Sequence, residues 1–541
     1  MQNGDLRVKT EAGVIEGIRE LNGAVRAFKG VPYAKPPLGA LRWRPPQAVE
    51  PWIGIRRTNS FGPRCIQFPR LKGTLLYFPP EPESEDCLYL NVWTPSKSAE
   101  ERLPVMVWYH GGAWFSGSAS QPLFYGETLA SRGAVVVTVN YRLGRLGFLA
   151  HPDLTRESGR GASGNYGIMD QIASLQWVQR NIAAFGGNPD CVTVFGQSAG
   201  AYAASFLMAS RHAKGMIHRA IAQSGAAFGP LVPSTGAGDS IQPLHEAEKL
   251  GVEFVRNMGA TSIDELRERT PQQVQLAPKA GRLSDRAADE PILPPRGWGA
   301  LDTGYPIVDG YVVPDMIHAV FSRGEQNDIP ILTGSNTHER GVAVQPPDSL
   351  DEYLRTWRGQ FGDWFEDFLA AYGANSIAEA KETGGRAIGD KLFSWQNWTW
   401  VRSQAKTGTA KIFYYRFARP APLPLGGYSE NPTGEPWTLH GAEIPYVFGS
   451  FAARDWAWQP ADHALSEVIS AYWINFARNG DPNGQGLPAW PAFDVNDPAV
   501  LMIRSKDDIR SAPVPDRNRL DFWDRFHASL PKVMADLENR E

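Results

Sequence analysis

The sequence predicts an α/β fold with a large, mostly parallel central sheet and helices on both of its faces. Short apolar runs recur along the chain, at 105–109, 134–140, 192–195, 329–333 and 411–416. Continuous runs of this kind are typical of parallel strands that are buried on both sides. Helical patterns lie between several of these runs, and alternating strands and helices form parallel sheets that helices cover. Ligands of such sheets bind at the carboxyl ends of the strands, so functional residues are expected there.

Two segments between the strands are predicted to be helices. Segment 167–187 places Ile168, Ile172, Leu175 and Ile182 on one face, and Gly186-Gly187 follows as a stop signal. Further on, Ser262 precedes Glu265 by three positions, a spacing that predicts a capping box at a helix start.

Length and charge limit the organisation and the partners of the chain. We expect one domain over 1–541, because no Gly/Ser tract, proline-rich hinge, charge block or internal repeat divides the 541 residues. The net charge of -4 favours neither nucleic acid nor an anionic membrane surface as a partner. The sequence predicts no oligomeric state.

The first residues and the cysteines bear on the compartment. The start MQNGDLRVKTEAGVIEG lacks the apolar segment of a secretory signal, which predicts a cytoplasmic protein as written. A secreted or periplasmic location stays open if Met1 was added to a mature chain. Of the three cysteines, Cys65 and Cys87 are near enough in sequence to close a modest loop, and such a bridge would favour an oxidising compartment. Cys191 is expected to be a buried free thiol.

The segment VTVFGQSAGAYAASFL predicts a strand, a sharp turn and a helix, with Ser198 in the turn. A turn this abrupt forces the serine into strained backbone geometry with its hydroxyl at the top of the sheet. Gly196 and Gly200 leave the space that the turn needs. Ser198 is therefore a candidate nucleophile. The alternative is a tight turn with an incidental serine.

A serine that attacks a carbonyl needs donors for the oxyanion that forms. The backbone N–H of Ala199 is one candidate. The turn in VMVWYHGGAWFSG follows a predicted strand and offers the amides of Gly111 and Gly112. His110 in this turn is interpreted as an orienting residue and not as a base.

The nucleophile also needs a base and an acid, which follow it in the order Ser, Asp or Glu, His in this type of fold. His440 lies in a loop after the last predicted strand and is the candidate base, with His338 as runner-up. Glu339 follows the strand in IPILTGSNTHERGV and is the candidate acid. Asp309 competes with it, although its Asp-Gly pair predicts a hairpin turn.

Several longer segments together resemble the type-B carboxylesterase family, also called cholinesterase-like esterases, within the α/β-hydrolase fold. They run from about Val14 to Asp494 and are FKGVPYAKPPLGALRWRPP, SEDCLYLNVWTP, YHGGAWFSG, NYRLGRLGFLA, GNYGIMDQIASLQWVQRNIAAFGGNPDCVTVFGQSAG, AIAQSG, HGAEIPYVFG and DPNGQGLPAWPAFD. The resemblance implies a serine carboxylic-ester hydrolase with long excursions around an active-site gorge, a small-molecule ester substrate, and no metal or organic cofactor.

The resemblance also assigns roles to residues. It implies a triad of Ser198, Glu339 and His440, and an oxyanion hole formed by Gly111, Gly112 and Ala199. It further implies a disulfide between Cys65 and Cys87, and a supporting serine, Ser224, near the acid.

The chain departs from the family pattern at two positions. Gln197 stands where Glu is common, which removes a charge near the serine. Arg340 replaces the glycine that usually follows the acid, so Glu339 is the least secure member of the triad.

The substrate is left open by the sequence. Trp114 and Phe115, or the cluster Trp395, Trp398 and Trp400, could line an apolar pocket, but tryptophans in such a fold are more often core residues. Arg282, Arg286 and Arg340 could bind an acidic substrate, although solvated loops explain most such charges. Hydrolysis of amides, carbamates or lactones uses the same residues, and a non-catalytic interaction protein of the same fold is the alternative from another class.

Overall fold

The computed structural model describes residues 6–68, 78–79, 81–229, 241–277, 304–339, 347–423 and 437–529. Its centre is an 11-stranded sheet with the strand order β18-β17-β16-β15-β12-β11-β9-β10-β8-β4-β3. In chain order these strands are β3 (Ile18–Glu20), β4 (Val25–Pro32), β8 (Tyr89–Thr94), β9 (Leu103–Tyr109), β10 (Val135–Val139), β11 (Gly187–Gln197), β12 (Arg219–Gln223), β15 (Ile331–Asn336), β16 (Ile412–Phe417), β17 (Ala499–Ser505) and β18 (Asp508–Pro513).

The middle of this sheet is parallel and its two edges are antiparallel. All neighbours from β17 to β10 in the strand order pair in parallel, whereas β18, β8, β4 and β3 pair antiparallel with their neighbours. The predicted mostly parallel sheet is confirmed, and all five predicted strand runs lie in it. The carboxyl ends of β11, β12 and β15 lie side by side, which brings the segments that follow them together.

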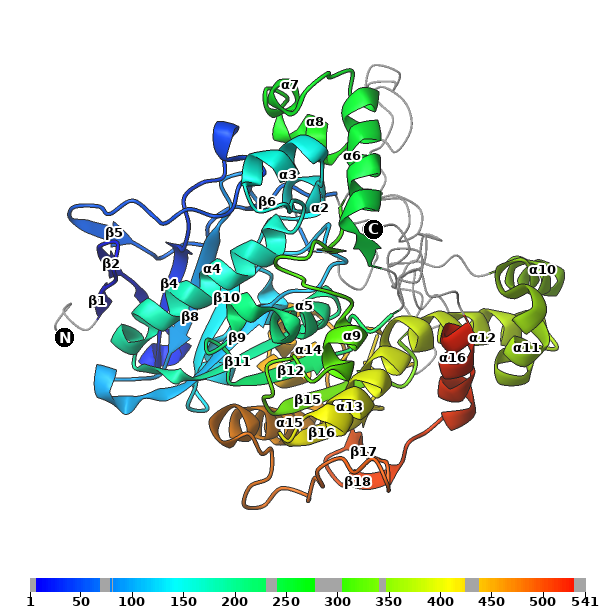
Figure 1. Cartoon of the computed structure of the whole chain (residues 1–541). Coiled ribbons are helices and arrows are strands. Elements are labelled where there is room, and N and C mark those ends of the chain that lie inside the picture. Colours follow the sequence, from blue (N-terminus) through cyan, green and yellow to red (C-terminus); the bar gives the residue numbers. More distant parts are fainter. Residues whose placement is uncertain are drawn as a thin grey trace.

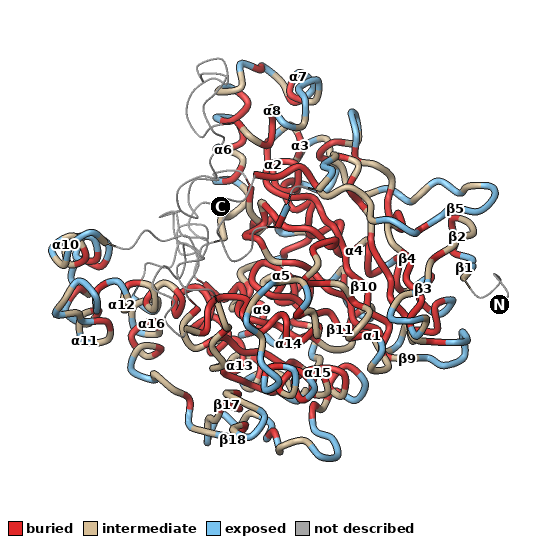
Figure 2. Tube along the Cα trace, turned by 180° about the vertical axis from the view of Figure 1, so that it is seen from behind, coloured by how far each residue is buried: buried red, intermediate tan, exposed pale blue. Residues whose placement is uncertain are grey.

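Helices cover both faces of the sheet (Figure 1). Along β9, Val105, Val107 and Tyr109 belong to one core cluster, whereas Met106 and Trp108 belong to the other. The first cluster includes residues of α4 (Tyr166–Asn181), α5 (Ala199–Ala209), α9 (Ile317–Ser322) and α13 (Trp395–Thr407), and the second includes residues of α1 (Glu127–Ala130), α14 (Ile444–Phe448) and α15 (Pro460–Asn479). Figure 2 shows the middle of the sheet buried and these helices partly buried, with exposed residues more frequent at the periphery.

The remaining elements surround this core. Two groups of helices extend from it, α2 (Gly144–Phe148), α3 (Pro152–Ser158), α6 (Leu244–Asn257), α7 (Ile263–Arg267) and α8 (Pro271–Gln275) at the top of Figure 1, and α10 (Leu350–Phe361), α11 (Phe365–Tyr372), α12 (Ile377–Gly389) and α16 (Arg517–Ser529) at its right. Three small sheets complete the described strands. One has the order β1 (Arg7–Lys9), β2 (Val14–Glu16), β5 (Ile55–Arg57), and the other two pair β6 (Arg64–Cys65) with β7 (Glu83–Ser84) and β13 (Gln242–Pro243) with β14 (Ile307–Val308).

The two predicted helices form, with small differences. The apolar residues predicted on one face of α4 are all buried, but the α-helix ends at Asn181, and a 3₁₀ turn (Ile182–Phe185) leads to Gly186 with φ 82°. At the start of α7 the Ser262 hydroxyl accepts a hydrogen bond from the N–H of Glu265, as predicted. The reciprocal half of the box is absent, because the Glu265 carboxylate accepts from the N–H of Thr261 instead.

Two buried arginines form ion pairs with buried carboxylates. Arg142 donates from Nη2 to Asp170 Oδ1 over 2.7 Å and joins the loop after β10 to α4. Arg42 donates to both carboxylate oxygens of Glu85, at 2.6 and 2.8 Å. Both pairs are charge-assisted and bidentate, so they hold distant segments in one orientation.

The predicted disulfide is present, whereas the predicted burial of Cys191 is wrong. Cys65 and Cys87 form a disulfide bond. Cys191 is the free cysteine of the described chain, but it is half-buried and not buried as predicted, because it lies near the start of β11 where the strand emerges. Its Sγ lies 3.2 Å from the Arg219 guanidinium.

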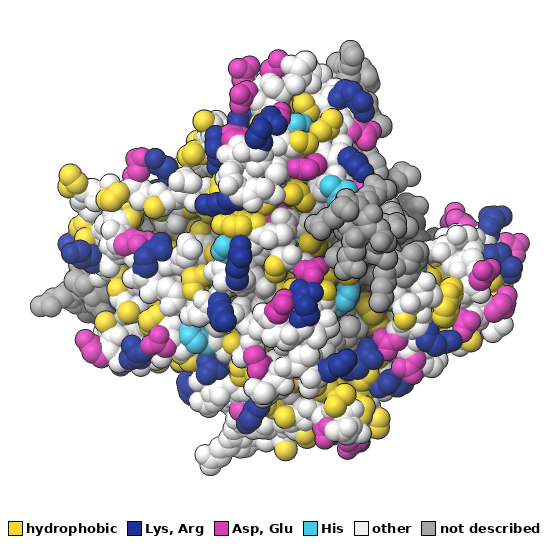
Figure 3. Space-filling view, viewed as in Figure 1, with side chains coloured by type: hydrophobic (Ala, Val, Ile, Leu, Met, Phe, Trp, Pro, Cys, Tyr) yellow, Lys and Arg dark blue, Asp and Glu magenta, His cyan; other side chains and the backbone are white. Residues whose placement is uncertain are grey.

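The surface carries charges of both signs. On the face seen in Figure 3, basic and acidic side chains are interspersed over the described part of the chain. This agrees with the small net charge. None of the helices in the described ranges combines the length and the apolar character needed to cross a membrane.

Candidate active site

Ser198 occupies the predicted sharp turn between β11 and α5. Its backbone has φ 56° and ψ -125°, a region that costs a non-glycine residue about 1–3 kcal/mol. The flanking glycines make this possible, since a Cβ on Gly200 would lie 1.8 Å from the carbonyl oxygen of Tyr109. A Cβ on Gly196 would lie 2.4 Å from the carbonyl carbon of Gly200. The strained turn therefore exists as predicted, with the serine at the carboxyl end of a central strand.

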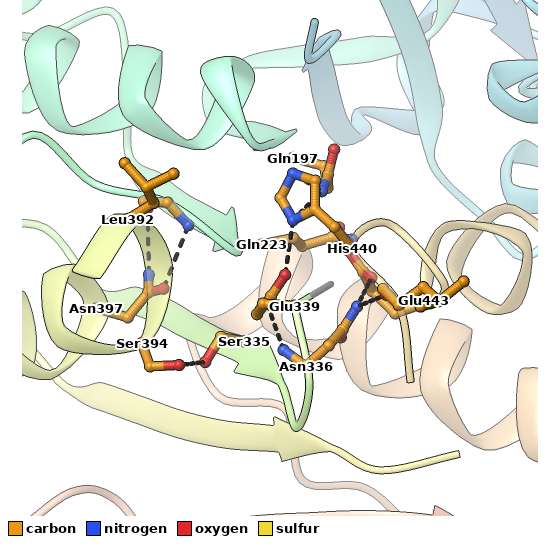
Figure 4. A network of polar contacts seen from close by, with 12 residues as sticks. Gln197, Gln223, Ser335, Asn336, Glu339, Leu392, Ser394, Asn397, His440 and Glu443 are labelled. Carbon is orange, nitrogen blue, oxygen red and sulfur yellow. Dashed lines mark hydrogen bonds and ion pairs between the residues drawn. The ribbon is translucent and has the colours of Figure 1, made fainter. Parts of the chain in front are cut away.

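Glu339 and His440 meet in the interior at the same end of the sheet. The Nδ1 of His440 lies 2.6 Å from Oε2 of Glu339, and both side chains are buried. The backbone of Glu339 has φ 43°, and its other oxygen, Oε1, accepts a hydrogen bond from the N–H of Asn336 at 2.5 Å. Figure 4 shows the carboxylate directed at the imidazole. A carboxylate at Nδ1 places the proton there and leaves Nε2 as the acceptor of the neutral ring.

The imidazole of His440 is held between two side chains. The Phe393 ring stacks on it with a centroid distance of 4.1 Å and an interplanar angle of 19°. The amide nitrogen of Gln197 lies 3.0 Å from Nε2 and 3.4 Å from Nδ1. A donor in line with one ring nitrogen would be far from the other, so this amide lies over the face of the ring. The in-plane acceptor direction of Nε2 is therefore not used by Gln197.

A pocket connects these residues to the glycine-rich turn. Its lining residues are Ala113, Trp114, Ser198, Ala199, Tyr202, Tyr305, Leu392 and Phe393. Ser198 thus shares a wall with Phe393, the residue that stacks on His440. Apart from Ser198, the lining residues are apolar or aromatic.

The turn after β9 approaches Ser198 closely. A Cβ on Gly111 would lie 3.0 Å from the Cβ of Ser198, so only glycine allows this contact. Gly112, Ala113 and Trp114 all have positive φ, at 118°, 54° and 65°. Consecutive residues in such conformations can aim their N–H groups at one concave point. Ala113, which the sequence did not single out, directly follows Gly111-Gly112 and lines the same pocket as Ser198.

Two predictions about neighbouring residues have mixed outcomes. The ring of His110 stacks on Tyr141 at 4.5 Å, and its Nδ1 lies 2.8 Å from the carbonyl oxygen of Gly111, which suits an orienting residue. Ser224 is buried with φ 56°, but its hydroxyl finds no hydrogen-bond partner among the described residues. The expected support of the acid by this hydroxyl is therefore not seen as a hydrogen bond.

The hairpin predicted at Asp309 is wrong. Oδ1 of Asp309 accepts hydrogen bonds from the N–H groups of Tyr311, Val312 and Val313, so the chain wraps around this carboxylate. The preceding strand β14 pairs in parallel with β13 and not with a following strand. Asp309 thus has a local structural use.

The structure places the tryptophans that could line a pocket, but not the arginines that could bind an acidic substrate. Trp395, Trp398 and Trp400 are buried core residues of α13, whereas Trp114 lines the pocket. Arg282, Arg286 and Arg340 lie outside the described residues.

Buried charges surround the site. Glu443 is buried, and desolvation together with the nearby charge of Glu339 raises its pKa. His338 precedes the acid, and burial followed by the charge of Arg386 lowers its pKa to about 4. It is therefore neutral near pH 7, and its Nε2 lies 3.2 Å from the Arg386 guanidinium. His338, the runner-up base, is paired with a cation and not with a carboxylate.

Comparison with known proteins bears directly on this arrangement. The model of the Carboxylesterase family matches residues 4–523. The chain belongs to the carboxylesterase family. Fumonisin B1 esterase of Sphingopyxis macrogoltabida is 36% identical over 501 residues, which cover 90% of this chain and 84% of that protein. Liver carboxylesterase 1 of Mus musculus is 34% identical, over 93% of this chain and 89% of that protein. Acetylcholinesterase of Bungarus fasciatus is 30% identical, over 99% and 88%.

Membership of the carboxylesterase family confirms the resemblance found in the sequence. The fold is that of the α/β-hydrolases, which agrees with the 11-stranded sheet. The protein is a serine carboxylic-ester hydrolase, and its substrates are small-molecule esters.

Proposed function

We propose that the carboxylesterase uses Ser198 as nucleophile, His440 as general base and Glu339 as the acid that orients the base. The buried contact of 2.6 Å between Glu339 and His440, beside a strained serine turn, carries this proposal. Glu339 fixes the proton on Nδ1, so Nε2 can take the proton of the Ser198 hydroxyl. The imidazolium that forms is stabilised by the adjacent carboxylate.

The reaction then follows from these roles. Ser198 Oγ attacks the ester carbonyl, and the tetrahedral oxyanion is stabilised by the N–H of Ala199 and by the turn of Gly111 and Gly112, to which the pocket lining adds Ala113. The alcohol leaves with the proton from His440. Water, deprotonated by the same base, then cleaves the acyl-enzyme. This step releases the carboxylic acid product and regenerates the Ser198 hydroxyl.

The pocket supports an uncharged, apolar group on one side of the ester. Its described lining contains no formally charged side chain. The relatives differ in the substrates that their names state, fumonisin B1 in one and acetylcholine in another, so identity alone selects none. The lining therefore favours simple alkyl or aryl esters.

A matched pair of substitutions tests the proposal. Glu339→Gln should lower kcat on p-nitrophenyl butyrate by about 10³- to 10⁴-fold, because the wrong tautomer of the base is favoured. Asp309→Asn is the control, because Asp309 is the competing carboxylate. Asparagine at this position keeps an oxygen that can accept the hydrogen bonds of the backbone N–H groups. A large loss in the control with little loss in Glu339→Gln would refute the assignment. Faster cleavage of the matched p-nitroanilide than of the ester by the wild type would contradict the ester preference.

A further inference from the structure

Asn336 is the last residue of β15 and is fully buried. It contacts both loops that carry the proposed acid and base. Its backbone N–H donates to Oε1 of Glu339 at 2.5 Å. Its side-chain Nδ2 donates to the carbonyl oxygen of Leu439, the residue before His440, at 2.7 Å. One residue therefore holds the acid by its backbone and the loop of the base by its side chain (Figure 4).

The second proton of the same amide is also used. Nδ2 donates to Oε2 of Glu443 at 2.7 Å, and Oε1 of Glu443 accepts from Nε2 of Gln223 at 3.0 Å. Both N–H groups of the Asn336 amide thus meet acceptors, which fixes its orientation, because the reversed amide would place its oxygen against a carbonyl and a carboxylate. Glu443 belongs to the same loop as His440 and is anchored to two strand ends.

The backbone of Asn336 is also held by a side chain of the neighbouring strand β16. Nη1 of the buried Arg416, on β16, donates to the carbonyl oxygen of Asn336 at 3.3 Å and to Oγ of Ser394 at 2.6 Å. The titratable groups around the amide are Glu339, Glu443 and His440 from the loops, and Arg416 and Tyr415 from β16. Glu339, Glu443 and Arg416 already place two carboxylates and one guanidinium in this interior. The neutral Asn336 amide donates hydrogen bonds between the loops without adding another charge.

We propose that Asn336 is a positioning residue that couples the acid to the base, by holding the Glu339 carboxylate and the His440 loop in one fixed relation. This inference rests on the proposed function. It adds that the contact of 2.6 Å between Glu339 and His440 depends on the Asn336 amide and not only on the loops' own packing. Loss of the amide removes the side-chain donor from Glu443 Oε2 and from Leu439 O, which keeps only the N–H of Ala442 at 3.1 Å, and lets the two loops separate.

The test compares Asn336→Ala and Asn336→Asp with Asn181→Ala. Asn181 is also buried and uses its amide for several hydrogen bonds, but it lies at the far end of α4. At pH 7.5 both Asn336 variants should lose about 10²-fold in kcat on p-nitrophenyl butyrate with KM changed little, as expected for a misplaced catalytic group. Labelling of Ser198 by a fluorophosphonate should slow in parallel. Asn181→Ala should keep kcat.

The pH profile separates positioning from a structural role. Asn336→Asp adds a carboxylate beside the base, which favours the imidazolium, so the ascending limb of kcat/KM should move to higher pH. Asn336→Ala adds no charge and should not move it upward. The exchanged pair Asn336→Asp with Glu443→Gln restores the number of carboxylates and should return the limb toward the wild-type position. Asn336→Asp is isosteric, so it carries the test if Asn336→Ala does not fold.

Three outcomes would overturn the inference: wild-type kcat in Asn336→Asp, an unmoved ascending limb in that variant, or an equal loss of kcat in Asn181→Ala. The proposed function is checked separately with Ser198→Ala. If Ser198→Ala keeps the activity, the proposed function fails. If Ser198→Ala is inactive and the Asn336 variants behave like the wild type, only the inference fails.

Discussion

At the scale of single residues, Gln197 contacts the proposed base without taking part in the proposed reaction. It precedes the proposed nucleophile, and its amide lies over the His440 ring opposite Phe393. A neutral amide there holds the ring in place and adds no negative charge to stabilise the imidazolium.

Gln197→Glu tests this role. A carboxylate against the ring should favour the protonated imidazole, because an opposite charge at this distance stabilises the imidazolium. The ascending limb of the kcat/KM profile should therefore move to higher pH. Gln197→Met keeps the length without the charge and should not move the limb. An unmoved limb in Gln197→Glu would show that the amide is not in electrostatic contact with the base.

The sequence led to these residues unevenly. Ser198 and its turn could be predicted, because strand, glycine spacing and helix all lie within one short segment. Glu339 and His440 came from chain order and family resemblance, since they are 101 residues apart and only folding brings them together. Asn336, Glu443 and Phe393 could not be singled out, because their roles depend on contacts between segments that carry no pattern of their own.

At the scale of elements, a short π-helical segment shapes the pocket. It spans Asp390–Ser394 between α12 and α13, and its five residues are buried. It directs Leu392 into the pocket and Phe393 onto the His440 ring. The carbonyl oxygen of Leu392 accepts a hydrogen bond of 2.6 Å from the Tyr202 hydroxyl of α5. π-Helical turns are rare in proteins overall, but many of them occur at functional sites. No pattern in the sequence predicted this one.

Tyr202 is predicted to limit the size of the group that the pocket accepts. Tyr202→Ala removes a wall and should shift the preference among p-nitrophenyl esters from short to longer acyl chains. We expect the ratio of kcat/KM for octanoate over acetate to rise about 10-fold, within the range for added methylenes in a hydrophobic pocket. Tyr202→Phe keeps the ring and should retain the wild-type ratio. An unchanged ratio in Tyr202→Ala would place the acyl chain elsewhere.

The elements of the sheet were more predictable than those around it. Buried parallel strands such as β9 and β10 have continuous apolar runs, so their positions were clear. The chain around Asp309 was mispredicted, because an Asp-Gly pair serves both hairpins and turns in which the carboxylate accepts backbone N–H groups. Only the absence of a following paired strand, a non-local fact, separates the two.

At the scale of the whole molecule, the disulfide joins a peripheral segment to the sheet. Cys65 of β6 pairs with Cys87, which precedes β8, across a sequence separation of 22. We propose that the protein matures in an oxidising compartment, because disulfides persist there. The organisation as one domain stays a prediction.

Removal of the disulfide should destabilise the protein without abolishing the fold. For a loop of this length, the double variant Cys65→Ser with Cys87→Ser should lose about 3 kcal/mol in the free energy of unfolding. Urea unfolding of both proteins measures this difference. Thiol titration of the denatured, unreduced wild type should find one free cysteine, Cys191. Three free thiols would contradict the pairing.

Acid should destabilise the fold through buried neutral histidines. Burial and, to a smaller extent, Lys391 lower the pKa of His527 to about 3, whereas an unfolded histidine has a pKa of about 6.5. Between these values the unfolded chain binds more protons, so the free energy of unfolding falls as the pH drops from about 6.5 toward 3. His527→Phe, which keeps a ring against Trp395, should lose less stability between pH 7 and pH 5 than the wild type. Equal losses in urea unfolding would contradict this origin.

The proposed function depends on Ser198 as the nucleophile, with His440 as the base and Glu339 as the acid. Intact-mass measurement after incubation with a fluorophosphonate tests it most directly. We expect one label on each wild-type chain, mapped to Ser198, and none on Ser198→Ala. A folded wild type that stays unlabelled, or a Ser198→Ala variant that is labelled as fast as the wild type, would contradict it.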